Sequence, residues 1–132
     1  MLDDSKLQSY IDNMLVQMAT AVKAHKGLLA WEIINEAEGL VRAGRSDSES
    51  CYDTQVLSGT GAGWAGKNIP MRNLQRFINK QAAAIKGIRG NEIMVTASGW
   101  SEKATINAYG YKNYFSDSCL TKAGGHSSGT LG

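Results

Sequence analysis

Asn35 and Glu36 are the residues of this 132-residue chain that could most readily do chemistry, because they directly follow an apolar stretch. Residues 28–34 read Leu-Leu-Ala-Trp-Glu-Ile-Ile, which predicts a buried strand. Parallel sheets present their reactive groups at the carboxyl ends of their strands. The pattern therefore predicts a carboxylate at the edge of a sheet, where it can exchange a proton. For an Asn-Glu pair taken alone, a strand-end turn with a solvated acid is the commoner case.

The predicted strand is apolar on both faces, as expected of a parallel strand that is covered on each side. Side chains alternate between the two faces, so Glu32 shares a face with Ile34 and Glu36. Glu32 is then a buried carboxylate, which must have a cationic or hydrogen-bonding partner or stay protonated.

The elements around this strand follow the order helix, strand, helix, strand, helix. Apolar residues spaced by three and four predict a first helix from Ser5 to about Lys26, with the methionines of its stripe packing in the core: Leu7, Tyr10, Ile11, Met14, Leu15, Met18 and Val22. Pro70 opens a second helix that ends at Gly87 or Gly90. A second strand follows over Glu92 to Ser98, and a short helix ends near Gly124. Two strands joined through a helix imply a parallel pair with a right-handed crossover.

Residues 37–68 form a long, polar, glycine-rich stretch, and loops of this length are usually functional or disordered. Trp64 lies among its glycines. An exposed indole suits carbohydrate, because sugar rings offer flat C–H faces to a π surface, and a hydrophobic plug that pins its own loop fits equally well. Trp100 follows the second strand and is expected at the same edge of the sheet as Glu36.

Four segments, in this order and spacing, resemble glycoside hydrolase family 5 and, within it, the secreted endo-β-1,4-mannanases. They are Trp-Glu-Ile-Ile-Asn-Glu at 31–36, Gly-Ala-Gly-Trp at 61–64 with Asn-Ile-Pro-Met at 68–71, Gln-Arg-Phe-Ile at 75–78, and Ser-Gly-Trp-Ser-Glu at 98–102. The family pattern W-[ED]-x-x-N-E-P ends in proline, where this chain has Ala37. Because proline restricts the backbone, we expect the aim of Glu36 to be less fixed here than in the family.

The resemblance covers roughly Leu7 to Gly129 and implies an α/β fold. The chain resembles a partial (β/α)8 TIM barrel, about helix 3 to helix 5 with two parallel strands. A whole barrel needs about 250 residues. Residues 1–132 are therefore expected to be a fragment of a single glycoside hydrolase catalytic domain that holds its central βα units.

The activity that the resemblance implies is endo-acting hydrolysis of β-1,4-mannosidic bonds in mannan-type polysaccharides. A retaining double-displacement mechanism needs two carboxyl groups about 5 to 5.5 Å apart. Glu36 would be the general acid/base, Asn35 would hydrogen-bond the sugar 2-hydroxyl, and Trp64 and Trp100 would bind substrate, although Trp100 could instead cap the barrel end. The nucleophile would come from strand seven, beyond residue 132, so the chain alone would be inactive. Alternatives are a non-catalytic carbohydrate-binding remnant and a cellulase-type β-glucanase of the same family.

Composition and two other motifs exclude several classes of function. The net charge of +2, without a basic patch, argues against nucleic acid, and no apolar stretch is long enough for a membrane span. Gly61 to Gly66 matches the dinucleotide pattern G-x-G-x-x-G but lacks the required strand before it and helix after it. Gly125 to Gly129 matches the nucleophile elbow G-x-S-x-G but lacks its strand. We expect no cofactor, no metal, and a monomer.

Cys51 and Cys119 both follow predicted strand ends on one side of the sheet, so they are candidates for a disulfide. Two buried free thiols are about equally compatible with the sequence alone. The resemblance implies an extracellular, secreted protein, although the first residues show no apolar signal segment.

Overall fold

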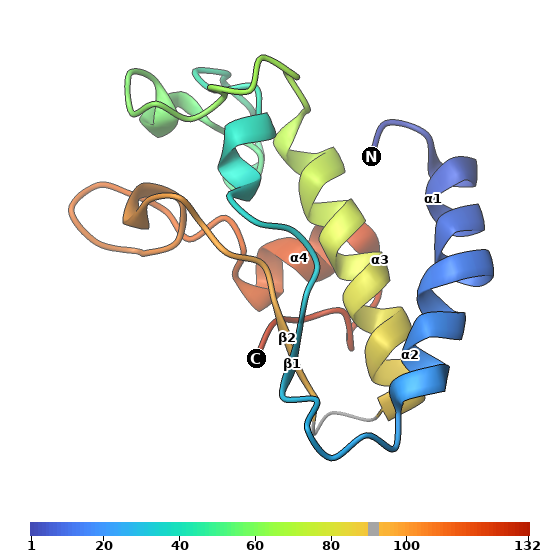
Figure 1. The fold of residues 1–132 in the computed structure, drawn as a ribbon. Helices are drawn as coiled ribbons and strands as arrows, with labels where there is room; N and C mark the ends of the chain where they lie inside the picture. Colours follow the sequence, from blue (N-terminus) through green and yellow to red (C-terminus); the bar gives the residue numbers. More distant parts are fainter. Residues whose placement is uncertain (90–92) are drawn as a thin grey trace.

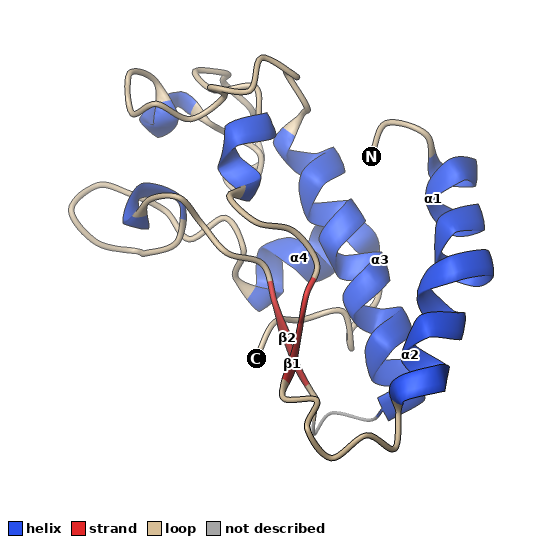
Figure 2. Ribbon diagram, in the orientation of Figure 1, coloured by secondary structure: helices blue, strands red, loops and turns tan. Residues whose placement is uncertain are grey.

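The computed structural model describes residues 1–89 and 93–132, which form helices α1 (Asp4–Tyr10), α2 (Val16–Val22), α3 (Met71–Arg89) and α4 (Asp117–Gly124) and strands β1 (Ala30–Glu32) and β2 (Met94–Thr96) (Figure 1). Short 3₁₀ helices lie at Ala37–Leu40, Gln55–Leu57 and Glu102–Ala104. The rest of the described chain is mostly loop (Figure 2). The predicted order of helix, strand, helix, strand, helix is confirmed.

The two strands are parallel, as predicted, and the structure places Trp31 opposite Val95. Both are shorter than expected, but hydrogen bonding continues beyond them. The Ile33 N–H donates to the Thr96 carbonyl at 2.8 Å, and the Ser98 N–H donates to the Ile34 carbonyl at 3.1 Å. The pairing therefore extends toward the residues predicted to be functional. The predicted start of the second strand, at Glu92, lies outside the described residues.

The first helix begins as predicted, because the Asp3 side chain accepts the N–H groups of Ser5 and Lys6 at 2.9 and 3.1 Å. It runs from α1 through a π-helical turn at Ile11–Leu15 into α2, and it ends at Val22, earlier than Lys26. Its buried row consists of Leu7, Ile11, Leu15 and Ala19.

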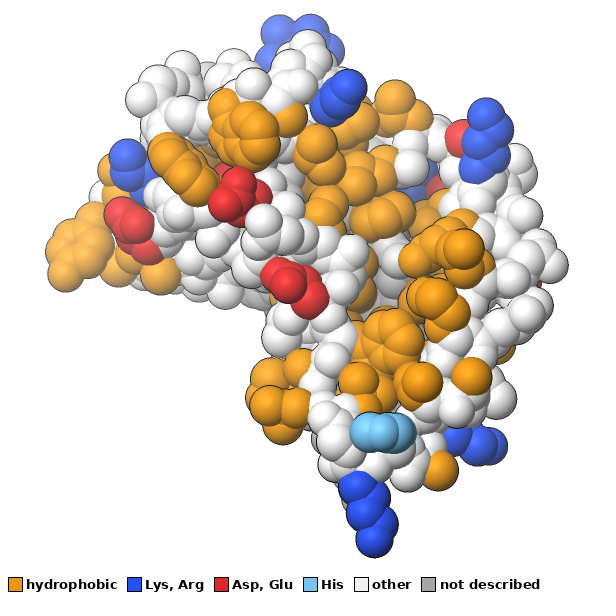
Figure 3. All heavy atoms as spheres, in the orientation of Figure 1, with side chains coloured by type: hydrophobic (Ala, Val, Ile, Leu, Met, Phe, Trp, Pro, Cys, Tyr) orange, Lys and Arg blue, Asp and Glu red, His pale blue; other side chains and the backbone are white. Residues whose placement is uncertain are grey.

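The prediction that the methionines of this helix pack in the core is wrong. Met14 and Met18 are 53% and 41% exposed. They lie outside the buried row, and Figure 3 shows hydrophobic side chains left open along this helix and toward the strands. No described element covers that side of the helix, which is why the predicted stripe is wider than the buried one.

Helix α3 lies at the centre of the fold, between α1–α2 on one side and α4 on the other (Figure 1). Its predicted apolar face is buried, with Leu74, Ile78, Ala82 and Ile85 almost inaccessible. Ion pairs from Asp4 to Arg76 (3.0 Å) and to Lys80 (3.8 Å) join it to α1. The helix continues through Gly87 to Arg89, so Gly87 does not end it, and the other predicted stop, Gly90, lies outside the described residues. A helical glycine costs only about 0.5 to 1 kcal/mol, which tertiary packing can offset.

Glu32 is exposed, so the prediction of a buried carboxylate is wrong. Trp31 and Ile33 pack against the cluster that joins α1, α3 and the strands. Glu32 points to the opposite face, and the sheet has only two strands in the part of the chain that the structure describes. The sequence pattern is that of a strand covered on both sides, but only one side is covered here.

A disulfide joins Cys51 to Cys119, with 5.3 Å between their Cα atoms, which confirms the predicted pair. It attaches the loop over residues 37–68 to α4. Gln75, buried on α3, donates from its amide to the carbonyls of Cys51 and Tyr114, both at 2.8 Å. The loop that follows β1 is therefore anchored to both α3 and α4.

The Tyr114 hydroxyl donates to the Asp53 carbonyl at 2.5 Å, and burial, with a smaller effect from the Asp53 charge, raises the Tyr114 pKa to about 12. The unfolded chain has the ordinary tyrosine pKa near 10. Because the folded pKa is the higher one, the stabilisation is complete below pH 10 and is lost as pH rises toward 12. We expect urea midpoints of the wild type and of Tyr114→Phe to converge between pH 10 and 12. A constant gap at pH 8 and pH 11.5 would contradict this, since the other tyrosines cancel in the difference.

Candidate active site

Glu36 lies directly after the paired strands, in a left-handed backbone conformation with φ +51° and ψ +49°. Such a φ is unusual for a residue other than glycine and marks a sharp change of chain direction. The next residue, Ala37, is fully buried, and its N–H donates to the Ser98 carbonyl at 3.3 Å. A proline at 37 has no N–H to donate, so this chain fixes the backbone after Glu36 by a hydrogen bond to the segment after β2.

Asn35 is held from the same segment. The Ser98 hydroxyl lies 2.8 Å from Asn35 Oδ1 and also hydrogen-bonds the Glu32 carboxylate. A hydroxyl has one proton, so it can donate to only one of these two acceptors at a time. Ser98 thus couples the Asn35 amide to Glu32 across the carboxyl ends of the two strands. The sequence analysis did not identify Ser98 as a site residue.

The position of Trp64 is compatible with both interpretations that the sequence left open. Its indole lies on Gly39, where a Cβ would come within 2.5 Å of the ring, and yet 61% of the residue is exposed. The Gly63 N–H donates to the Glu38 carbonyl, and the Ala65 N–H donates to the Gly39 carbonyl, both at 2.9 Å. The indole is therefore fixed against the turn after Glu36 while it offers most of its surface to solvent.

Trp100 is also exposed, at 54%. It lies beside Gly61, where a Cβ would be 3.0 Å from its ring. Both tryptophans thus belong to loops that contact one another beyond the carboxyl ends of the strands (Figure 1). The structure brings together the segments of Asn35, Glu36, Trp64 and Trp100, as predicted for one edge of the sheet.

Glu38 is a residue of this region that was not predicted to belong to the site. It lies two residues after Glu36, is 2% exposed, and accepts the Ser101 N–H at 2.8 Å through Oε1. An acid between small residues, in Ala37-Glu38-Gly39, was the available signal that this carboxylate could be enclosed. Its position links the segments that follow the two strands.

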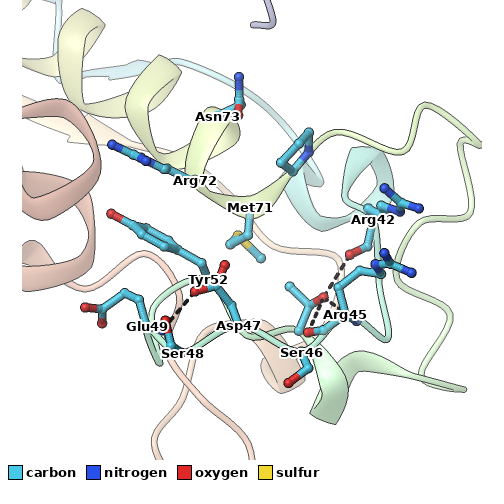
Figure 4. A pocket seen from close by; sticks show the side chains of 12 residues that line it. Arg42, Arg45, Ser46, Asp47, Ser48, Glu49, Tyr52, Met71, Arg72 and Asn73 are labelled. Atoms are coloured by element: carbon cyan, nitrogen blue, oxygen red, sulfur yellow. Dashed lines mark hydrogen bonds between the residues drawn. The ribbon is translucent and has the colours of Figure 1, made fainter.

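The pocket in Figure 4 does not add to this site. It has a volume of about 510 Å³, lies between residues 42–54 and the start of α3, and is lined by none of the predicted site residues. Arg72 lies over the Tyr52 ring at 5.7 Å, whereas Arg42 and Arg45 extend at the far end (Figure 4). The guanidinium groups therefore do not converge on one ligand.

The described residues contain neither a cluster of metal ligands nor a membrane-spanning helix. Among residues 1–89 and 93–132, no three histidine, cysteine or acidic side chains gather as metal ligands would. Nor does any described helix have the length and apolar character that crossing a bilayer requires.

The fold is that of part of a (β/α) barrel, and a carboxylate and two exposed indoles lie in the segments that follow its parallel strands. The chain is 52% identical over 131 residues to a mannan endo-1,4-β-mannosidase of Mytilus edulis, an alignment that covers 99% of the chain and 35% of that relative. A solved endo-1,4-β-mannanase of Eisenia fetida matches 98% of the chain with 52% identity and a TM-score of 0.94, over 35% of its own length. The β-1,4-mannanase of Aplysia kurodai matches with 39% identity and a TM-score of 0.95, over 98% of the chain and 37% of its own. No protein-family model matches.

These similarities confirm the predicted resemblance to endo-β-1,4-mannanases and the partial-barrel fold class. The chain spans about a third of the length of the curated relatives that it matches: 35% of the Mytilus edulis protein and 33% of a mannan endo-1,4-β-mannosidase of Cryptopygus antarcticus. It is therefore similar to one part of a β-mannanase over nearly all of its residues.

Proposed function

We propose that these residues supply the acid/base half of an endo-acting hydrolase of β-1,4-mannosidic bonds. Glu36 protonates the leaving oxygen and later activates the attacking water, and Asn35 hydrogen-bonds the sugar 2-hydroxyl. The nucleophilic carboxylate that a retaining mechanism requires comes from outside residues 1–132. On this proposal, residues 1–132 are a fragment of one glycoside hydrolase catalytic domain.

The observation that carries the proposal is the position of Glu36 after β1. The hydrogen bond from the Ala37 N–H to the Ser98 carbonyl fixes this turn to the segment that contains Trp100. Trp64 and Trp100 remain exposed although loop glycines contact them, which suits stacking on sugar rings. The similarity to enzymes named mannan endo-1,4-β-mannosidase supports mannan as the substrate.

We further propose a polysaccharide partner, a monomeric state and an extracellular location. The Cys51–Cys119 disulfide supports the location, because disulfides persist in oxidising compartments. The exposed tryptophans also favour the second candidate function, a non-catalytic carbohydrate-binding remnant, since binding alone needs no nucleophile.

The test uses both the isolated chain and a chimera in which this chain replaces the corresponding part of the Mytilus edulis relative. We expect the isolated chain to be retarded in mannan gels without releasing reducing sugar. The chimera should hydrolyse mannan, and Glu36→Gln should lower its kcat by about 10² to 10⁴-fold, the range for loss of a general acid/base.

Three outcomes would contradict the proposal. Mannan turnover by the isolated chain that Glu36→Gln abolishes would mean that the nucleophile lies within residues 1–132. A chimera whose turnover survives Glu36→Gln would remove Glu36 from the mechanism and leave the binding remnant. Stronger retardation in gels of β-glucan than of mannan would point to a β-glucanase instead.

A further inference from the structure

Glu38 is a buried acid in a place where burial is costly. It is 2% exposed, and one of its two carboxylate oxygens, Oε2, is enclosed without a hydrogen-bond partner among the described residues. Burying a carboxylate lowers stability unless it is fully hydrogen-bonded, and an apolar side chain of similar size is often no worse for the fold. The acid at this position therefore calls for an explanation other than stability.

The other oxygen provides that explanation. Oε1 accepts the backbone N–H of Ser101 at 2.8 Å, a hydrogen bond between residues 63 positions apart in the sequence. Ser101 begins the 3₁₀ helix Glu102–Ala104, and its own hydroxyl accepts the Lys103 N–H at 3.2 Å. The carboxylate thus fixes the point at which the chain turns after Trp100.

Backbone contacts connect the same residue to the other predicted site segments. The Glu38 carbonyl accepts the N–H of Gly63, the neighbour of Trp64. Gly99, just before Trp100, lies beside the same carboxylate: a Cβ there would be 3.5 Å from Glu38 Oε1, an ordinary contact distance, and 2.8 Å from Thr105 Cγ2, so the glycine permits the close approach of Thr105. One residue therefore contacts the loops of both indoles, and it lies two positions after Glu36.

We propose that Glu38 is a positioning residue: through Ser101 it sets the place of Trp100 relative to the turn that carries Glu36. This inference rests on the proposed function for its consequence in sugar binding. Its structural part, the effect on Ser101 and Trp100, stands independently. Glu38 does not touch the substrate and takes no proton from it.

The test uses the full 132-residue chain as wild type, Glu38→Leu and Glu38→Gln. Glutamine keeps an oxygen that can accept the Ser101 N–H, whereas leucine fills the space without an acceptor. In Glu38→Leu, we expect hydrogen exchange of the Ser101 amide to accelerate about tenfold, as for an N–H that loses its hydrogen-bond acceptor. The Trp100 line should shift in ¹⁹F NMR of 5-fluorotryptophan-labelled protein, and the Kd for β-1,4-mannohexaose should rise about tenfold. In Glu38→Gln, the Ser101 exchange rate and the Kd for mannohexaose should both stay within about threefold of wild type.

Glu102→Leu is the matched control, because Glu102 is an exposed acid next to Ser101. It should leave the Ser101 exchange and the Trp100 line unchanged. Glu38→Asp, with a side chain one methylene too short to reach Ser101, replaces the leucine variant if that variant does not fold. It should show the same losses.

The proposal is overturned if Ser101 exchange and the Trp100 line are unaffected in Glu38→Leu or Glu38→Asp, or if Glu38→Gln loses as much as they do. If the wild type does not bind mannohexaose, the proposed sugar binding fails. The Ser101 and Trp100 signals then still decide whether Glu38 positions the loop.

Discussion

Replacing both Cys51 and Cys119 by alanine is expected to lower the free energy of unfolding by about 3 to 4 kcal/mol. The bridge closes a loop of 68 residues, and a cross-link across so long a loop removes much conformational freedom from the unfolded chain. Single domains are stable by only about 5 to 15 kcal/mol, and this chain leaves part of its apolar surface open. The variant should therefore be partly unfolded at 37 °C. Circular dichroism at 37 °C measures the unfolded fraction, and a urea titration measures the loss of unfolding free energy.

Lys122→Ala is the control, because the Glu49–Lys122 ion pair joins the same two segments without a covalent bond. The hydrogen bond from Lys122 lowers the Glu49 pKa, but Lys122 is exposed and Glu49 is partly exposed, and ion pairs at the surface contribute little. We expect an almost unchanged urea midpoint. Reduced wild type should unfold like the double-alanine variant. Equal midpoints for the oxidised and reduced wild type would show that the long-loop argument does not apply here.

The sequence correctly predicted the buried face of the central helix, the direction of the two strands and the meeting of their carboxyl ends. The apolar face of α3 follows from periodicity, and the parallel direction of β1 and β2 follows from a crossover through one helix; the register of the two strands was not predicted. The segments of Asn35, Glu36 and Trp100 met at one edge of the sheet because strand ends in a parallel pair must do so. These features depend on short stretches of chain and on one topological rule.

Burial at Glu32 and Met14 was predicted wrongly because it depends on neighbours that the pattern cannot supply. Both lie on surfaces that no described element covers, and the sheet of the described chain has two strands. Glu38 is the opposite case. Its Oε1 accepts the N–H of Ser101, 63 residues away in the sequence, and alternation along a strand carries no information about such a contact.

Asn79→Ala is expected to lower the free energy of unfolding by about 3 kcal/mol, because one buried amide makes three hydrogen bonds to the C-terminal segment. Its Nδ2 donates to the carbonyls of His126 (2.8 Å) and Gly129 (2.9 Å), and its Oδ1 accepts the His126 N–H at 3.2 Å. Gly124 and Gly129 lie so close to the Asn79 amide that a Cβ at either glycine would overlap it. The amide is therefore tightly packed against the C-terminal segment. Thermal unfolding and exchange of the Gly129 amide measure the loss.

Two control variants distinguish the effect of losing the hydrogen-bond donors of Asn79 from the effect of losing its side-chain volume. Asn13→Ala removes an exposed asparagine that bonds only within its own helix, to Ser9, and should change stability by less than about 0.5 kcal/mol. Asn79→Asp keeps the shape but turns a carboxylate oxygen toward two carbonyls, so it should destabilise at least as much as alanine. A milder effect of aspartate than of alanine would mean that filling the space matters more than the donors. Because the Gly132 N–H donates to the Val95 carbonyl at 3.1 Å, the segment that Asn79 holds reaches β2, and its release should also loosen the open edge of the sheet.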